Sequence, residues 1–163
     1  MVAIRRTSLL RRRYEVSADG GPTIEWHGRA RRGGVETDEI DGSLVAVRPE
    51  GRKRFVLSRD GAEIGAARRH RRIWELTVEG RAYELRRRSM WRSARELRRP
   101  DGSVAGSVTR ARGGRSLVSV EVDDDLSPLA QMFIGFVVIV LWDREAQDAA
   151  AGASAAGVAA SGS

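Results

Sequence analysis

The run from Met132 to Trp142 contains no polar residue, and it constrains the fold more than any other part of the sequence. Ser127 and Pro128 precede this run. That order is typical of a helix that begins at the proline and has the serine as its N-cap. A helix that is apolar on every side must be buried on every side. The sequence therefore predicts a buried helix over residues 128–142.

Three environments could bury this segment. A bilayer requires about twenty apolar residues, and the acidic residues at both ends, Asp125 and Asp143, give neither side an excess of positive charge. The β-branched residues 137–140 would suit a central strand, although the Ser-Pro start favours a helix. The third environment is the interior of a closed sheet. The residues predicted to form the core of the helix are Met132, Phe133, Ile134, Phe136, Val137, Ile139, Val140 and Leu141.

Most of the chain before the helix alternates between apolar and polar residues. Trp74, Leu76 and Val78, for example, alternate with Glu75 and Thr77, as in strands that bury one face. A helix of about fifteen residues and a strand of about seven both span roughly 22 Å. We therefore predict a mainly β fold, a closed antiparallel β-barrel of roughly ten to twelve short strands around one buried hydrophobic C-terminal helix.

Turn signals punctuate the alternating segments. Asp-Gly pairs favour two-residue hairpin turns, because both central residues need a positive φ. Two of these pairs belong to a weak internal repeat of strand, turn and strand, in which Gly65 follows Asp60-Gly61 and Gly106 follows Asp101-Gly102. This pattern predicts a duplicated hairpin within one sheet.

The composition divides the chain into three parts. We predict an N-terminal extension over residues 1–8, the barrel with its central helix over residues 9–142, and a tail over residues 143–163. The tail is rich in Ala, Gly and Ser, which predicts disorder.

Alternating strands, the strand–Asp-Gly–strand–Gly pattern and the closing acidic-Leu-Ser-Pro-apolar helix together resemble the Tubby-like superfamily. This group includes the LURP-one-related proteins and the phospholipid scramblases. The resemblance covers about residues 9–142 and implies a closed antiparallel barrel around a hydrophobic C-terminal helix. Tubby domains bind phosphoinositide headgroups and scramblases act at membranes, so the resemblance also implies phospholipid binding. No headgroup-binding residue of the family matches a position in this sequence.

The charge is unevenly distributed. The net charge is +7, but residues 1–115 carry +13 and residues 116–163 carry −6. Arginine clusters recur at spacings of about two strands, which would place them at one end of a barrel and form a basic rim. The alternative is that these charges simply occupy loops and solvated strand faces. The residues predicted to bind an anion are Arg68, Arg69, Arg71, Arg72, Arg86, Arg87 and Arg88.

Catalytic chemistry has little support in the sequence. The chain has no cysteine, and its two histidines, His27 and His70, lack the spacing of metal ligands. We interpret His27 as structural and His70 as a solvated residue. Asp123 to Asp125 are better explained as residues near the positive end of the helix dipole than as a cation site. We therefore predict no catalytic residues, no metal, no cofactor and no enzymatic activity.

These features predict a non-enzymatic binding module for anionic phospholipid or another phosphate-bearing ligand at a membrane surface. Two alternatives remain: a nucleic-acid or protein interaction domain that uses the same arginines, and a membrane protein anchored by the apolar helix. The lack of cysteine fits a reducing compartment. The expected location is the cytoplasm, with docking at the inner face of the membrane.

Overall fold

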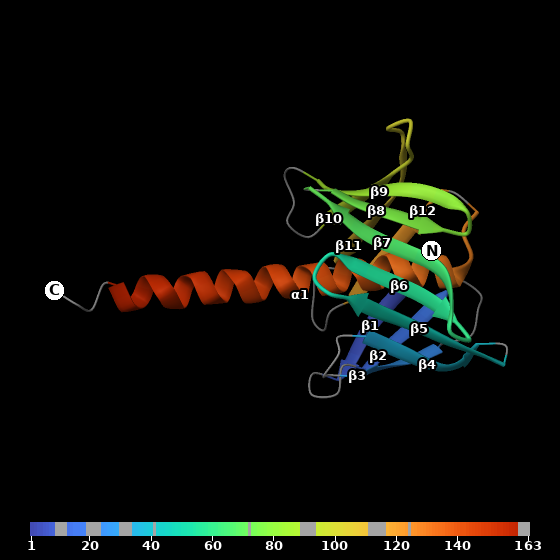
Figure 1. Cartoon of the computed structure of the whole chain (residues 1–163), viewed down its shortest axis with the longest axis horizontal. Coiled ribbons are helices and arrows are strands. Elements are labelled where there is room, and N and C mark those ends of the chain that lie inside the picture. The colour runs from blue at the N-terminus through green and yellow to red at the C-terminus, as the bar shows by residue number, and fades with distance from the viewer. Residues whose placement is uncertain are drawn as a thin grey trace.

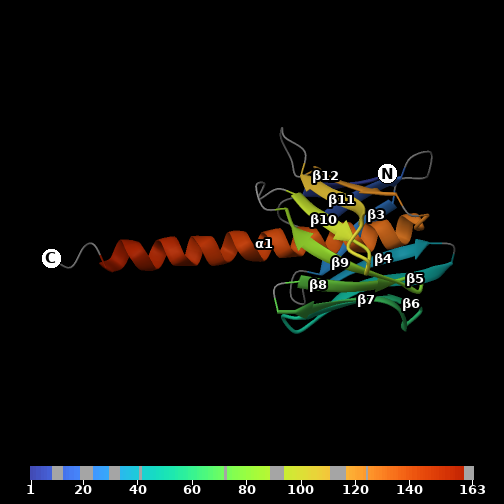
Figure 2. The same ribbon diagram turned by 90° about the horizontal axis from the view of Figure 1, so that it is seen from above.

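The computed structural model consists of strands that surround the first half of one long helix (Figure 1). Viewed from above, strands lie on both sides of this helix (Figure 2). The structure describes residues 1–8, 13–18, 24–29, 34–40, 42–71, 73–88, 94–110, 117–123 and 125–159.

The described residues contain twelve strands followed by one helix. The strands are β1 (Val2–Ser8), β2 (Arg13–Ala18), β3 (Ile24–Arg29), β4 (Gly34–Ile40), β5 (Ser43–Glu50), β6 (Arg54–Arg59), β7 (Ala62–His70), β8 (Ile73–Val78), β9 (Arg81–Arg87), β10 (Ala94–Arg98), β11 (Val104–Arg110) and β12 (Leu117–Val122). The helix is α1 (Pro128–Ala159).

Each strand pairs antiparallel with the strands before and after it in the sequence, and β1 also pairs with β12. Trp74, Leu76 and Val78 are buried in the same hydrophobic core as the helix, while Glu75 and Thr77 are exposed. Asp60 and Gly61 both have positive φ, 49° and 84°, as a tight hairpin turn requires. The predicted mainly β fold of short antiparallel strands with one C-terminal helix is confirmed.

The prediction that residues 1–8 form an N-terminal extension is wrong. Val2–Ser8 form β1, which lies between β2 and β12. Val2 and Ile4 are buried against the helix. A Cβ atom added to Gly135 would lie 2.5 Å from Ile4 Cδ1 and 2.8 Å from Val120 Cγ2. The glycine thus allows α1 to approach β1 and β12 closely. This strand was not predicted because its sequence has only two apolar residues in alternation, which is too short a pattern to indicate a strand.

The internal repeat corresponds to two equivalent hairpins, β6–β7 and β10–β11. Leu57 pairs with Gly65 in the first hairpin, and Leu97 pairs with Gly106 in the second. In both hairpins the register shifts immediately after the leucine. The shared leucine–glycine pair and the shared irregularity confirm the prediction of a duplicated unit.

The first half of α1 is buried as the sequence predicts. The Ala130 amide donates a 3.2 Å hydrogen bond to the Ser127 hydroxyl, so Ser127 is the N-cap. Phe136 packs edge-on against Tyr14, with ring centroids 6.3 Å apart. Within the part of the chain that the structure describes, no helix combines the length and apolar character needed to cross a membrane. All eight predicted core residues of the helix are buried except Val140, which is partly buried.

The predicted disorder of residues 143–163 is contradicted up to Ala159, where α1 ends; residues 160–163 lie outside the described part. The helix is buried up to Trp142, and its second half extends away from the sheet (Figure 1). The composition suggested disorder because the tail has almost no large apolar side chains. However, alanine is the best helix former, and a helix that is already nucleated in the core extends without a new nucleation cost.

Candidate functional site

The inner face of the sheet changes from apolar to basic where α1 leaves it. On β9, Leu85 is buried and Arg87, two residues further along, is exposed. Side chains two apart on a strand share a face, so both belong to the inner face. The same change occurs from Ala67 to Arg69 on β7, from Leu97 to Arg95 on β10, and from Val108 to Arg110 on β11. We call Arg69, Arg87, Arg95 and Arg110 the exit rim.

Two exit-rim arginines share a carboxylate of the helix. Arg87 and Arg95 are opposite each other on neighbouring strands. Arg95 Nη2 donates to Glu145 Oε1, and Arg87 Nη2 lies 3.4 Å from Glu145 Oε2. Arg95 is only 7% exposed. A buried guanidinium needs a negative partner, and Glu145 supplies it from the first turn outside the sheet.

Two further cations, Arg110 of the sheet and Arg144 of the helix, make contacts between α1 and the sheet at the same end. Arg110 lies over the Trp142 ring, 4.9 Å from its centroid. Arg144 lies 5.0 Å from the centroid of the Phe55 ring and donates a 2.9 Å hydrogen bond to the Arg52 carbonyl. Burial lowers the pKa of Arg144, and repulsion from Arg52 lowers it further. The guanidinium nevertheless stays charged at neutral pH.

The predicted anion-binding residues divide between two faces of the sheet. Arg69 and Arg87 belong to the exit rim. Arg71 is exposed in the turn after β7, where its carbonyl accepts a 3.2 Å hydrogen bond from Arg69 Nε. Arg72 lies outside the described residues. The alternation of β7 and β9 places Arg68 and Arg86 on the outer face. Arg88 follows β9 and contacts Glu96, whose side chain is on the same outer face. We call Arg68, Arg86 and Arg88 the outer-face arginines.

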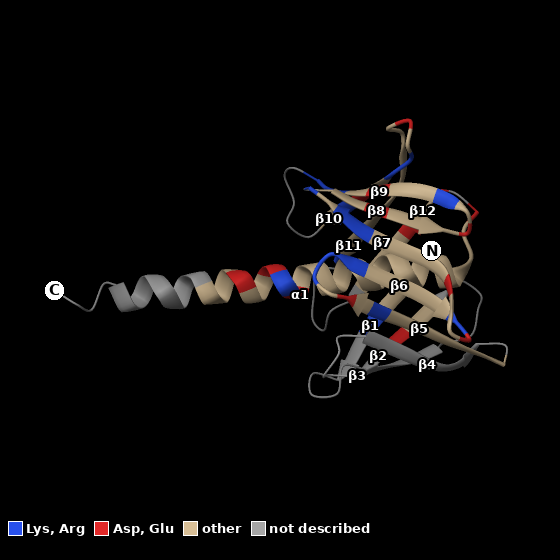
Figure 3. Cartoon of the chain, in the orientation of Figure 1, with Lys and Arg blue, Asp and Glu red and all other residues tan. Residues whose placement is uncertain are grey.

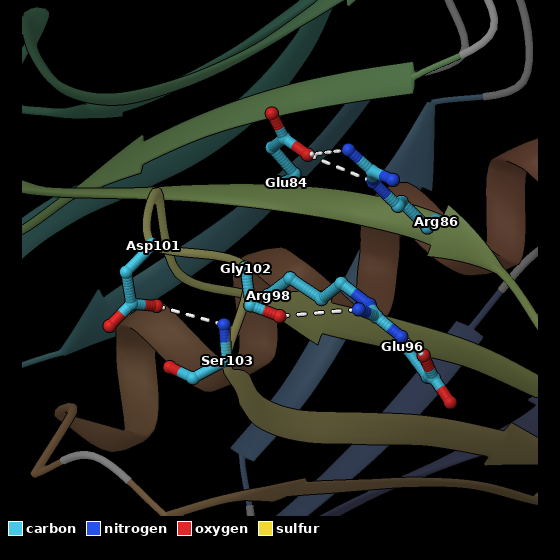
Figure 4. Close-up of polar contacts among 7 residues, drawn as sticks. All are labelled: Glu84, Arg86, Glu96, Arg98, Asp101, Gly102 and Ser103. Carbon is cyan, nitrogen blue, oxygen red and sulfur yellow. Dashed lines mark hydrogen bonds and ion pairs between the residues drawn. The ribbon is translucent and has the colours of Figure 1, made fainter.

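Carboxylates compensate two of the outer-face arginines. Arg86 Nη2 lies 2.6 Å from Glu84 Oε2, and Arg88 Nε lies 3.5 Å from Glu96 Oε1. Glu96 also pairs with Arg98, which reaches the carbonyl of Gly102 in the β10–β11 turn (Figure 4). These exposed pairs contribute little to stability, but they reduce the positive charge that the outer face offers to a ligand.

The two ends of the sheet differ in charge (Figure 3). The turns at the end opposite the exit rim carry exposed acids, among them Asp60, Glu79 and Asp101, together with exposed bases such as Arg81. Hydrogen bonds from Ser103 lower the pKa of Asp101, so this carboxylate is ionised at neutral pH. Among the described residues, the positive charge is therefore concentrated at the helix exit.

The predicted site does not include Arg95, because this residue stands apart from the arginine clusters, and it does not include Arg110, which belongs to a cluster that the prediction left out of the site. The signal that would have found them is positional. Each lies on the inner face two residues from a buried apolar residue, and each is near the end of its strand: Arg95 precedes Leu97, and Arg110 follows Val108. Arg144 was missed because the segment after Trp142 was interpreted as a tail.

The described residues provide no evidence for a metal centre, because no three potential ligands of the His, Asp or Glu type gather among them. His70 is exposed at the end of β7, in agreement with its interpretation as a solvated residue. The structure does not describe the His27 side chain. No protein-family model, curated protein or solved structure matches this chain.

Proposed function

We propose that the protein is a non-enzymatic binding module that docks its exit rim on anionic phospholipid at a membrane surface. The observation that carries this proposal is the change from apolar residues to arginine on the inner face of four strands, all at the helix exit. Cations at such a surface attract anionic lipid by about 1 kcal/mol each. The resemblance to the Tubby-like superfamily, with its phospholipid-binding members, agrees with this function and with a location at the inner face of the membrane.

Flotation with vesicles tests the proposal. The wild-type protein should float with vesicles that contain phosphatidylglycerol at low salt, but not with neutral phosphatidylcholine vesicles, and salt should release it. The triple variant Arg69→Gln, Arg87→Gln, Arg110→Gln should bind about 100-fold more weakly, because three cations at about 1 kcal/mol each are lost.

The outer-face arginines provide a matched control for this experiment. The variant Arg68→Gln, Arg86→Gln, Arg88→Gln removes three charges as well and should retain most of the affinity, because these side chains lie on the outer face and not on the rim that is proposed to dock. An equal loss in both triple variants would contradict a role for the exit rim.

Competition with nucleic acid tests the alternative. If a short oligonucleotide at equal phosphate concentration releases the protein from vesicles, the protein is a nucleic-acid binder.

We further propose that the sheet is a closed barrel in solution, with the helix as its permanent core. The antiparallel pairing of β1 with β12 supports this, because these are the first and last strands. The chain has no cysteine, so a disulfide between two introduced cysteines forms without competition from native thiols. Ala3 pairs with Ser119 across the two strands, and both side chains are partly exposed. The double variant Ala3→Cys, Ser119→Cys should form an intramolecular disulfide under mild oxidation.

Two further cysteine pairs provide the controls for barrel closure. Thr77 and Ala82 pair across the β8–β9 hairpin, so cysteines at these positions should cross-link. Cysteines at Ala3 and Ala82, which lie on strands that do not pair, should not. A cross-link between positions 77 and 82 without one between positions 3 and 119 would show that the barrel is open between β1 and β12.

A further inference from the structure

The side chain of Arg95 is held in an incomplete arrangement. It is buried, and its Nε atom has no hydrogen-bond partner among the described residues. Its Nη2 atom donates to Glu145. A carboxylate that engaged Arg95 as a two-pronged fork would fill both positions. Glu145 fills only one, because its second oxygen faces Arg87.

A second buried donor lies at the same end of the sheet. Trp142 Nε1 has no hydrogen-bond partner among the described residues either. Trp142 and Glu145 are three residues apart in α1 and therefore share one face of the helix. Two arginines thus contact one carboxylate, and this end of the sheet holds two buried donors without a partner among the described residues, Arg95 Nε and Trp142 Nε1. An anion with more acceptor oxygens than a carboxylate would satisfy this arrangement better.

We propose that Arg87 and Arg95 form a binding site for a phosphate monoester group, and that Glu145 occupies this site when the ligand is absent. A monoester has three terminal oxygens. Two can accept from Nε and Nη2 of Arg95, and the third can accept from Arg87. The ligand displaces Glu145 from both arginines. This inference rests on the proposed function in that it gives the exit rim one defined ligand group, and it adds competition by a residue of the protein itself.

Glu145 is suited to this role by its position. Its side chain is 41% exposed, so it can move into solvent while Arg95 stays in place. It lies just beyond Trp142, where the buried part of the helix ends. Removing its charge should therefore raise the affinity for phosphate, while the loss of the partner of buried Arg95 lowers the stability of the phosphate-free protein.

The test compares two substitutions that change the charge of the same helix equally. In Glu145→Gln the competing carboxylate is lost, whereas Asp148→Asn alters an exposed acid one turn further along. Titration with inorganic phosphate at constant ionic strength should show about tenfold tighter binding for Glu145→Gln, the effect of about one charged hydrogen bond. The change for Asp148→Asn should stay below about twofold, because an exposed charge is screened. Equal changes in the two variants would overturn the proposed site.

A second measurement does not depend on Glu145→Gln being stable. Phosphate should raise the melting temperature of the wild-type protein above that in chloride of equal ionic strength, because a ligand that binds only the folded state stabilises it. Arg87→Gln, which changes an exposed side chain, should abolish this increase. An unchanged increase in Arg87→Gln, or no increase in the wild type, would contradict the site.

Vesicles distinguish a lipid headgroup from free phosphate as the ligand. Phosphatidic acid carries a phosphate monoester and phosphatidylglycerol a diester. Glu145→Gln should tighten binding to phosphatidic acid vesicles more than to phosphatidylglycerol vesicles if the group is presented by lipid. A gain with inorganic phosphate alone would support the site with a soluble ligand. If Glu145→Gln binds inorganic phosphate more tightly than the wild type but no anionic vesicle binds the protein, the proposed membrane function fails and the phosphate site remains. If vesicles bind but Glu145→Gln and Asp148→Asn behave alike, the site fails and the membrane function remains.

Discussion

Replacing Phe136 by aspartate is expected to leave the protein unable to fold. Phe136 lies in the buried first half of α1, is 2% exposed, and packs edge-on against Tyr14 of β2. Removing a buried phenyl ring costs about 3–5 kcal/mol, and an unpaired charge in the same place costs several kcal/mol more. The total stability of a domain is only about 5–15 kcal/mol. The variant should be insoluble or lack a cooperative thermal transition by circular dichroism.

The control places the same residue on an exposed part of the same helix. Gln147 is exposed beyond the sheet, so Gln147→Asp should melt within a few degrees of the wild-type protein, as surface substitutions usually do. A soluble Phe136→Asp protein with a normal melting curve would contradict the burial of the helix inside the sheet.

Replacing Gly106 by alanine should cost about 3 kcal/mol or more of unfolding free energy. An added Cβ atom would lie 2.2 Å from the Glu121 carbonyl oxygen and 2.8 Å from Val122 Cα. Both are backbone atoms of β12, so relief requires β11 and β12 to move apart. Overpacking against side chains alone typically costs about 1–3 kcal/mol. The loss corresponds to a melting temperature lower by about 10 °C for a domain of this size.

Gly65, the equivalent glycine of the duplicated hairpin, provides a control of the same chemistry. A Cβ atom there would lie 3.2 Å from the Thr77 carbonyl oxygen and 3.2 Å from Val78 Cγ1. Small adjustments relieve such contacts, so Gly65→Ala should cost about 1 kcal/mol or less. Similar losses at both positions in chemical denaturation would show that glycine acts through the unfolded chain and not through close approach to β12.

The predictable part of the fold depends on local patterns. The alternation of Trp74, Leu76 and Val78 indicates which face of β8 is buried, and the Ser127-Pro128 pair marks the start of the helix. These patterns suffice because strand alternation and N-capping are decided within a few residues. The strand β1 was missed because its place between β2 and β12 depends on a partner at the other end of the chain, which contributes no local signal.

The candidate site was predictable only in part for a related reason. The spacing of the arginine clusters indicated that cations gather at one end of the sheet, and Arg69, Arg87 and Arg110 lie there. The prediction took each run of adjacent arginines as one binding site, so it included residues that lie on opposite faces of the sheet. Consecutive strand residues point to opposite sides, so Arg86 and Arg87 have different surroundings although they are neighbours in the sequence.

The sequence by itself determined that a helix apolar on all sides must be shielded from water, and that strands with one solvent-exposed face would surround it. Both follow from the cost of exposing apolar surface, which depends on composition and period. Only the tertiary structure decided that Glu145 meets Arg87 and Arg95, some fifty residues earlier in the chain. The reason is geometric: the depth of α1 within the sheet sets which helical turn emerges beside these strands. That depth results from the packing of the whole core.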